Sequence, residues 1–121
     1  MSDPLTEKII GAAIEVHKEL GPGLLERIYE EALCYELEIR GIPFERQMEA
    51  VIRYKGRDIK GQRLDIVVDD SVVVELKSVS KLPEVAMAQV LSYLRATGLK
   101  TGLLINFNHT KLIDGVKRIS L

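Results

Sequence analysis

The chain has 121 residues, of which 46% are hydrophobic and 29% are charged, and this describes one ordinary globular domain over residues 1–121. No apolar run approaches the roughly 18 residues of a membrane span and the first residues lack a signal-peptide pattern, so we expect a cytoplasmic protein with no membrane partner. The formal net charge of -1 argues against a strong non-specific grip on nucleic acid, although it allows a locally basic groove around an acidic metal site.

The first forty residues predict two helices. Residues 4–20 carry apolar side chains at three- and four-residue steps and form one stripe. Gly21-Pro22-Gly23 then forces a sharp turn, and a second helix is expected from about Leu24 to Arg40. The predicted buried face of this second helix is made of Leu25, Ile28, Ala32, Leu33 and Leu37.

The second helix also carries a candidate site residue near its start. Glu26, Tyr29 and Glu30 are three and four positions apart, so they share one face of the helix. In the functional interpretation, Glu26 is a further metal ligand or a carboxylate that positions water. The alternative, which spacing alone favours, is a surface acid that compensates the partial positive charge of the first helical turn.

Residues 44–60 predict a strand, a turn and a second strand. Apolar and charged residues alternate there, and Lys55-Gly56-Arg57-Asp58 has the composition of a hairpin turn. Residues 59–69 are expected to continue the meander, with Gly61 at a bulge or at a close approach to substrate.

Two apolar strands at the centre of the chain, Gln62–Val68 and Val72–Lys77, carry the ionisable residues Asp65, Glu75 and Lys77. Glu75 and Lys77 share one face because side chains alternate along a strand. Carboxylates held close together repel each other unless a cation neutralises them, and Mg²⁺ or Mn²⁺ with oxygen ligands suits this role. The lysine could then act on a water or on developing phosphate charge. The alternative is a charged end of a buried strand, without a metal.

The loop between these strands decides whether the three charges meet. A three-residue loop, Asp69-Asp70-Ser71, sets Asp65 directly opposite Glu75 on one face of the hairpin. A two-residue loop, Asp69-Asp70, pairs Asp65 with Val74 instead and breaks the cluster.

The remaining elements complete the predicted fold. Residues 83–96 predict a third helix, on which Gln89 and Tyr93 share a face that either reaches the site or is solvated. Residues 101–107 predict a central strand, and residues 111–120 a weaker final strand. The order of two helices, four strands, one helix and two strands predicts an α/β (α+β) fold with a mixed sheet flanked by helices, in which the crossover helix joins parallel strands.

Asp65, nine residues and then Glu75-Leu-Lys77 resemble the core motif of the PD-(D/E)XK nuclease superfamily. Arg63-Leu64 precede the aspartate, where many members have a proline. Glu26 on an upstream helix and Gln89-Val-Leu-Ser-Tyr93 on the following helix resemble the further motifs of the RecB-like branch. Gly23-Leu-Leu-Glu-Arg-Ile-Tyr29 matches the signature that names the GxxExxY protein family.

The resemblance implies a restriction-endonuclease-like core that uses Mg²⁺ or Mn²⁺ to hydrolyse nucleic-acid phosphodiester bonds, with DNA favoured. It implies metal ligands at Asp65, Glu75, the Leu76 carbonyl and Glu26, catalytic roles for Lys77, Glu75, Asp65 and Glu26, and substrate binding by Gln89 and Tyr93. The alternative is a non-catalytic or partner-dependent module that binds nucleic acid or protein and retains the nuclease fold. A core of this size gains binding surface as a homodimer or in a larger complex.

Overall fold

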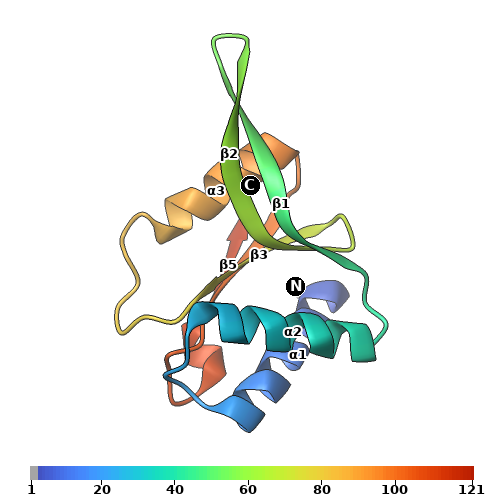
Figure 1. Ribbon diagram of the computed structural model, residues 1–121, viewed down its shortest axis with the longest axis vertical. Helices are drawn as coiled ribbons and strands as arrows, with labels where there is room; N and C mark the ends of the chain where they lie inside the picture. The colour runs from blue at the N-terminus through green and yellow to red at the C-terminus, as the bar shows by residue number, and fades with distance from the viewer. Residues whose placement is uncertain (1–2) are drawn as a thin grey trace.

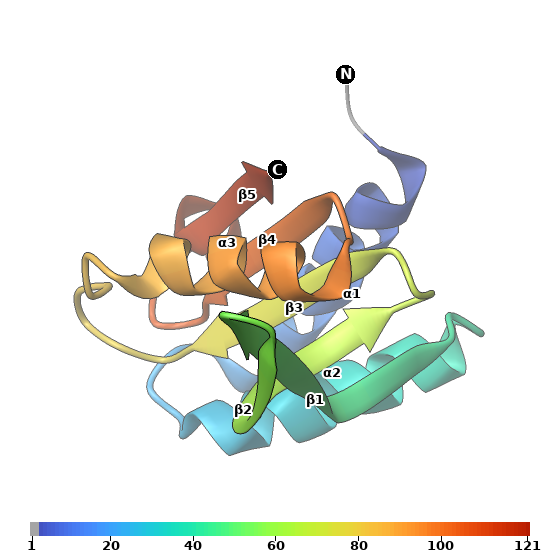
Figure 2. The same cartoon turned by 90° about the horizontal axis from the view of Figure 1, so that it is seen from above.

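The computed structural model describes residues 3–121, in which a five-stranded sheet lies between two layers of helices (Figures 1 and 2). In chain order the elements are α1 (Pro4–Leu20), α2 (Glu26–Ile39), β1 (Phe44–Tyr54), β2 (Arg57–Val68), β3 (Val72–Lys77), α3 (Ala86–Thr97), β4 (Thr101–Asn106), the 3₁₀ turn η1 (Leu112–Gly115) and β5 (Val116–Ser120). None of the helices in this described part is long and apolar enough to cross a membrane.

The strands are arranged in the order β1-β2-β3-β4-β5. Every neighbouring pair is antiparallel except β3 and β4, which are parallel and are connected through α3. A parallel pair needs a crossover connection, and α3 supplies it on one face of the sheet. This arrangement confirms the predicted α/β (α+β) class, the mixed sheet and the crossover helix.

The sheet has a separate hydrophobic core on each face. Helices α1 and α2 pack on one face, against Val72, Val74 and Leu76 of β3 among others. Helix α3 packs on the opposite face, where Val73 of β3 contributes to the second core. Since side chains alternate along a strand, Glu75 and Lys77 belong to the α3 face with Val73. Strand β3 is therefore apolar on one face and carries charge on the other only at its carboxyl end.

Close contact between α3 and the sheet depends on a glycine. A Cβ atom built on Gly102 of β4 would lie 2.6 Å from Cγ1 of Val90 on α3, and a real side chain there would have to push the helix away. The glycine lets α3 lie close to the sheet, and so brings the polar residues of α3 toward the end of β3.

The predicted division of residues 44–69 into three strands is wrong, because β2 is a single long strand. The turn that precedes it has only two residues, Lys55 and Gly56, and both have positive φ angles (49° and 81°), as in a type I′ turn. The register shifts between Ala50 and Ile52, opposite Gly61, whose φ is 121°. The predicted bulge is thus present, and it interrupts the alternation of side chains without ending the strand.

The predicted buried face of the second helix is also partly wrong. Helix α2 begins at Glu26, two residues later than expected, and Leu25 and Ile28 are exposed. Leu33 and Leu37 are buried as predicted, and they are joined by Tyr29, Glu30 and Cys34. The face is rotated because the ring of Tyr29 stacks on Phe107, with ring centroids 4.3 Å apart.

Two boundaries near the C-terminus differ from the prediction. Helix α3 starts at Ala86, three residues later than expected, after a turn closed by the Ala86 amide donating to the Pro83 carbonyl. The last strand starts only at Val116 because residues 112–115 form η1. Gly115 ends this 3₁₀ turn so close to β4 that a Cβ atom would lie 2.1 Å from the Asn106 carbonyl oxygen.

Candidate active site

The hairpin of β2 and β3 has the three-residue loop on which the site prediction depends. Val68 pairs with Val72, so Asp69, Asp70 and Ser71 form the loop, closed by the Ser71 amide donating to the Val68 carbonyl. Both aspartates have positive φ angles, a conformation that aspartate tolerates better than most residues. The register that follows sets Asp65 opposite Glu75 and excludes the two-residue loop.

The carboxylates of Asp65 and Glu75 reach across the hairpin to the opposite strand. The Asp65 amide donates to Oε1 of Glu75, and the Leu76 amide donates to Oδ2 of Asp65, each over 2.9 Å. Regular pairing of the two strands ends just before this point, at Ile66 and Val74. The side chains thus satisfy amides that the ladder leaves unpaired, and these hydrogen bonds hold the two acids in place.

The two acids carry more negative charge than their surroundings neutralise. Glu75 is only 3% exposed, and burial together with the negative charge of Asp65 raises its pKa from 4.5 to about 8. The Asp65 amide and the charge of Lys77 oppose this shift. Among residues 3–121, neither carboxylate forms an ion pair with a basic side chain. Two apposed oxygen donors of this kind suit a hard divalent cation.

Glu26 lies near this pair at the exposed start of α2. Partial burial of its carboxyl group raises its pKa, the negative charge of Asp65 raises it further, and the charge of Lys77 lowers it. The connection to β3 is direct, since the Ser78 hydroxyl donates to the Leu24 carbonyl over 2.5 Å. The start of α2 is therefore held beside the end of β3, and Glu26 belongs to the same electrostatic cluster as Asp65 and Lys77.

The acids do not form a ready-made metal cage. Within the described residues, no three His, Cys, Asp or Glu side chains are grouped closely enough to hold a metal ion together. Asp65 and Glu75 meet, whereas Glu26 belongs to their surroundings. A bound cation would need further oxygen donors, for which the Leu76 carbonyl, water and a substrate phosphate are the candidates.

Helix α3 brings its polar face over the same end of the sheet. Tyr93 is 2% exposed, and its hydroxyl accepts a hydrogen bond from Nε2 of Gln62 over 2.7 Å. Burial raises the pKa of Tyr93, the bond from Gln62 lowers it, and the charges of Glu75 and Asp65 raise it further. Tyr93 is therefore not part of a solvated face. Gln89, one turn earlier on α3, is half-buried.

Two polar residues that the sequence analysis did not single out support this site. Gln62 connects β2 to Tyr93, and its position three residues before Asp65 was the available signal. Asn106 is buried at the end of β4, where its side chain accepts from the Val79 amide and donates to the Val79 carbonyl. Because Asn106 also pairs with Lys77, it fixes the chain directly after the lysine.

Tyr29, the tyrosine of the Gly-x-x-Glu-x-x-Tyr segment, holds the loop that precedes α2. Its hydroxyl donates to the Gly21 carbonyl over 2.5 Å and accepts from the Leu24 amide over 3.1 Å. Its ring is fully buried against Phe107. Tyr29 is thus a positioning residue, which fixes the turn from which Glu26 emerges.

We expect Tyr29→Phe to lower the free energy of unfolding by about 1–3 kcal/mol, because the Gly21 carbonyl and the Leu24 amide lose their partner while the ring stack remains. Urea denaturation measures this loss. Tyr35→Phe is the matched control, since Tyr35 lies on the same helix, is 64% exposed and should change stability by less than about 0.5 kcal/mol. Equal losses in both variants would contradict the assigned role of the hydroxyl.

Comparison with known proteins agrees with this geometry. A family model described as the PD-(D/E)XK nuclease superfamily matches residues 3–119, almost the whole chain. Neither the curated proteins nor the solved structures contain a match.

Proposed function

We propose that this chain, which belongs to the PD-(D/E)XK nuclease superfamily, is a metal-dependent nuclease that hydrolyses phosphodiester bonds of DNA. Nucleases of this superfamily generally use divalent metal ions. The observation that carries the proposal is the apposition of Asp65 and Glu75, which are held by each other's strands and lack a neutralising basic partner among residues 3–121. A pair of this kind is costly for a fold unless a cation uses it.

The residues of the site would divide the chemistry as follows. Asp65 and Glu75 hold Mg²⁺ or Mn²⁺, with Glu26 and the Leu76 carbonyl as supporting donors. When bound, such a cation polarises phosphate oxygens and lowers the pKa of water. Lys77 shares the face of Glu75, and there its amine orients the attacking water or stabilises charge on the phosphate.

Helix α3 supplies the substrate contacts in this proposal. The charges of Glu75 and Asp65 act on the hydroxyl of Tyr93, and the side chain of Gln89 lies next to that hydroxyl. This supports a role for Gln89 and Tyr93 in holding the nucleic-acid backbone next to the acids. Gly23, Glu26 and Tyr29 support the narrower placement in the GxxExxY family, and Gln89 with Tyr93 supports the RecB-like branch. Association as a homodimer or in a larger complex remains part of the proposal.

Isothermal titration calorimetry with Mn²⁺ tests the metal site directly. We expect one binding event for the wild type and at least tenfold weaker binding for Asp65→Asn, because the amide keeps the hydrogen bond from Leu76 but loses the negative charge. Asp69→Asn, in the exposed hairpin loop, is the control and should bind like the wild type. Unchanged binding in Asp65→Asn would place the metal elsewhere. Metal binding without cleavage of any DNA or RNA would favour a partner-dependent module.

A further inference from the structure

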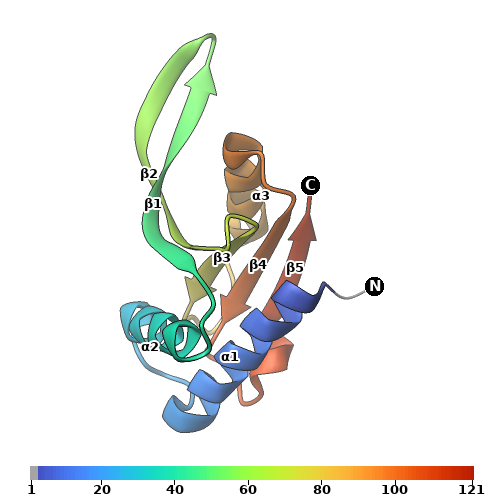
Figure 3. The same cartoon turned by 90° about the vertical axis from the view of Figure 1, so that its right-hand side faces the viewer.

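The ends of β1 and β2 form a projecting arm, residues 51–61, which the proposed chemistry does not use. Strand β2 pairs with β3 only from Ile66 to Val68, so in the arm β1 and β2 pair with each other alone. Figures 1 and 3 show this two-stranded ribbon rising beyond the rest of the molecule and past α3. Val51 and Ile52 at its base are partly buried, whereas residues 53–61 are exposed and their side chains are available for binding.

The arm carries a positive net charge, although the whole chain does not. It contains Arg53, Lys55, Arg57 and Lys60 but only one acid, Asp58, so it carries a net charge of +3 while the whole chain carries -1. Arg53 lies 3.6 Å from Asp58, whereas the other three cations form no ion pair within the described residues. All three are exposed. Positive charge is thus concentrated where the chain projects farthest.

The turn at the end of the arm places a lysine beside an aromatic ring. The two-residue turn keeps the ribbon narrow, and Nζ of Lys55 lies 5.4 Å from the centre of the Tyr54 ring, close enough for a cation–π contact. Tyr54 is 59% exposed, as expected for a side chain that has no packing partner in the fold.

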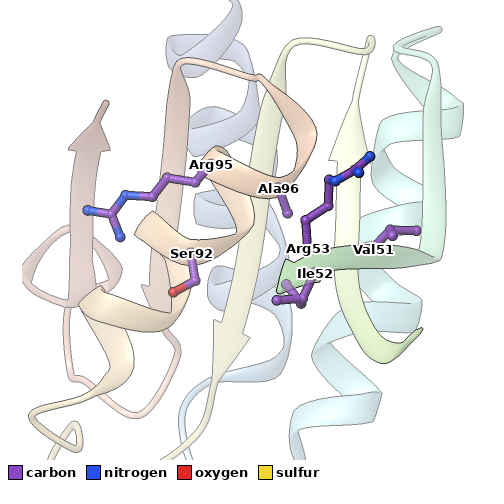
Figure 4. Close-up of a pocket in the computed structure, with 6 residues that line it drawn as sticks. All are labelled: Val51, Ile52, Arg53, Ser92, Arg95 and Ala96. Atoms are coloured by element: carbon purple, nitrogen blue, oxygen red, sulfur yellow. The ribbon is translucent and has the colours of Figure 1, made fainter. Parts of the chain in front are cut away.

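The base of the arm continues this positive surface. A cavity of about 360 Å³ lies between β1 and α3 and is lined by Val51, Ile52, Arg53, Ser92, Arg95 and Ala96 (Figure 4). Arg53 comes from the strand and Arg95 from the helix, and Figure 4 shows their guanidinium groups extending away from each other. They would therefore contact different phosphates rather than enclose a single small anion.

Strand β2 connects the arm to the acids. Lys60 precedes Asp65 by five residues, and Arg57 precedes it by eight. At about 3.3 Å per residue along a strand, Lys60 lies at most roughly 16 Å from Asp65, and Arg57 at most roughly 26 Å. The bulge at Gly61 bends the ribbon between them. A linear anionic molecule could contact both the arm and the acids.

We propose that the arm binds the backbone of duplex DNA at up to about eight base pairs from the bond that the site cleaves, with the ribbon seated in the major groove. This rests on the proposed nuclease function for the position of the site, and on the charge of the arm for binding. The major groove of B-form DNA is about 12 Å wide and admits a two-stranded ribbon. The deep, narrow groove of duplex RNA does not. Single strands are bound on several stacked aromatic rings, and Tyr54 is the one aromatic residue of the arm.

The test compares two triple variants with the same change of charge. Lys55→Gln/Arg57→Gln/Lys60→Gln removes the unpaired cations of the arm, and Lys8→Gln/Lys18→Gln/Lys111→Gln removes three exposed lysines elsewhere. Fluorescence anisotropy with a labelled 16-base-pair DNA hairpin, in EDTA to prevent cleavage, gives Kd between 25 and 200 mM NaCl. In the arm variant we expect roughly tenfold weaker binding at the lowest salt and a slope of log Kd against log salt that is smaller by up to about 2.7. The control variant should bind within about twofold of the wild type.

The length of the duplex supplies a second measurement. A hairpin with only six base pairs is roughly 20 Å long at about 3.4 Å per base pair. DNA placed at the acids then reaches Lys60 but not Lys55 or Arg57 at the end of the arm, so the arm variant should lose clearly less affinity for it than for sixteen base pairs. A difference as large as that seen with sixteen base pairs would overturn the assigned spacing. Equal loss of binding in both triple variants, or no loss in the arm variant, would show that the arm charges only protect the edge of the sheet. Preference for duplex RNA or single-stranded DNA would overturn the proposed groove.

These measurements distinguish a failure of the arm assignment from a failure of the proposed nuclease function. If the arm variant loses DNA binding and the wild type with Mn²⁺ cleaves no DNA, the arm assignment stands and the nuclease proposal falls. If the wild type cleaves DNA and the arm variant binds DNA as well as the wild type does, the nuclease proposal stands and the arm assignment falls. Thermal unfolding of both variants should match the wild type because all six side chains are exposed.

Discussion

Replacing Lys77 with methionine should lower the rate of metal-dependent DNA cleavage by a factor of about 10²–10⁴ and leave the protein folded. Lys77 is half-buried at the end of β3, on the face that carries Glu75. In the part of the chain that the structure describes, its amine forms no ion pair, so the fold loses little when the charge is removed. Methionine retains most of the apolar stem. A loss of this size is typical when a general acid–base group or a group that stabilises developing charge is deleted.

The measurement is the initial rate of plasmid cleavage at saturating Mn²⁺ and low salt, where contacts to the DNA backbone are strongest. Calorimetry should show Mn²⁺ binding to Lys77→Met at an affinity close to that of the wild type, which separates a catalytic loss from a lost metal. Lys100→Met, at an exposed lysine, is the matched control and should cleave normally. Undiminished cleavage by Lys77→Met would show that the lysine has no part in the reaction, or that the activity comes from a contaminant.

The sequence predicted the central pair of acids because that prediction depends on local structure. The alternation of side chains on β3 places Glu75 with Lys77. The sequence left a three-residue and a two-residue loop open, and the three-residue loop of the structure places Asp65 opposite Glu75. The parallel pair of β3 and β4 followed from the length of the connection that contains α3. None of these inferences required knowing which side chains meet across the core.

The features that the sequence analysis missed depend on tertiary contacts. The buried face of α2 is set by the stack of Tyr29 on Phe107, two residues that are far apart in the chain. The bond between Gln62 and Tyr93 exists because α3 packs closely over the sheet at Gly102. The bulge at Gly61 was predicted, but alternation alone could not show that β2 continues through it.

The second large effect concerns the pH dependence of stability. Burial first, and then the charge of Asp65, raise the pKa of Glu75 to about 8 in the folded chain, against 4.5 for an ordinary glutamate. Below pH 4.5 the carboxyl group is protonated in both states and does not affect stability. Between pH 4.5 and 8 the unfolded chain releases this proton while the folded chain keeps it, so stability falls as pH rises. Above pH 8 the loss is complete and amounts to several kcal/mol, at about 1.4 kcal/mol per pKa unit.

Glu75→Gln should therefore be more stable than the wild type at pH 8.5 in EDTA, and close to it at pH 4.5. Glutamine resembles the protonated carboxyl group, and its side-chain oxygen can still accept the hydrogen bond from the Asp65 amide. Urea denaturation at the two pH values measures the difference. Glu84→Gln is the control, because Glu84 is exposed and its replacement should leave the pH dependence of the wild type unchanged. A wild type whose stability does not fall relative to that of Glu75→Gln between pH 5 and 8 would contradict a buried, protonated Glu75.

Added Mg²⁺ should reduce this difference at pH 8.5. The cation binds the ionised pair of the folded wild type, and at a concentration one hundred times its Kd it adds about 2.7 kcal/mol to the free energy of unfolding. Glu75→Gln offers one charge in place of two, so Mg²⁺ should stabilise it much less. Binding of Mg²⁺ thereby offsets part of the stability loss that two apposed carboxylates impose on the wild type. Equal stabilisation of the two proteins by Mg²⁺ would mean that the cation binds away from Glu75, and the raised pKa of this residue would then have no connection with a metal site.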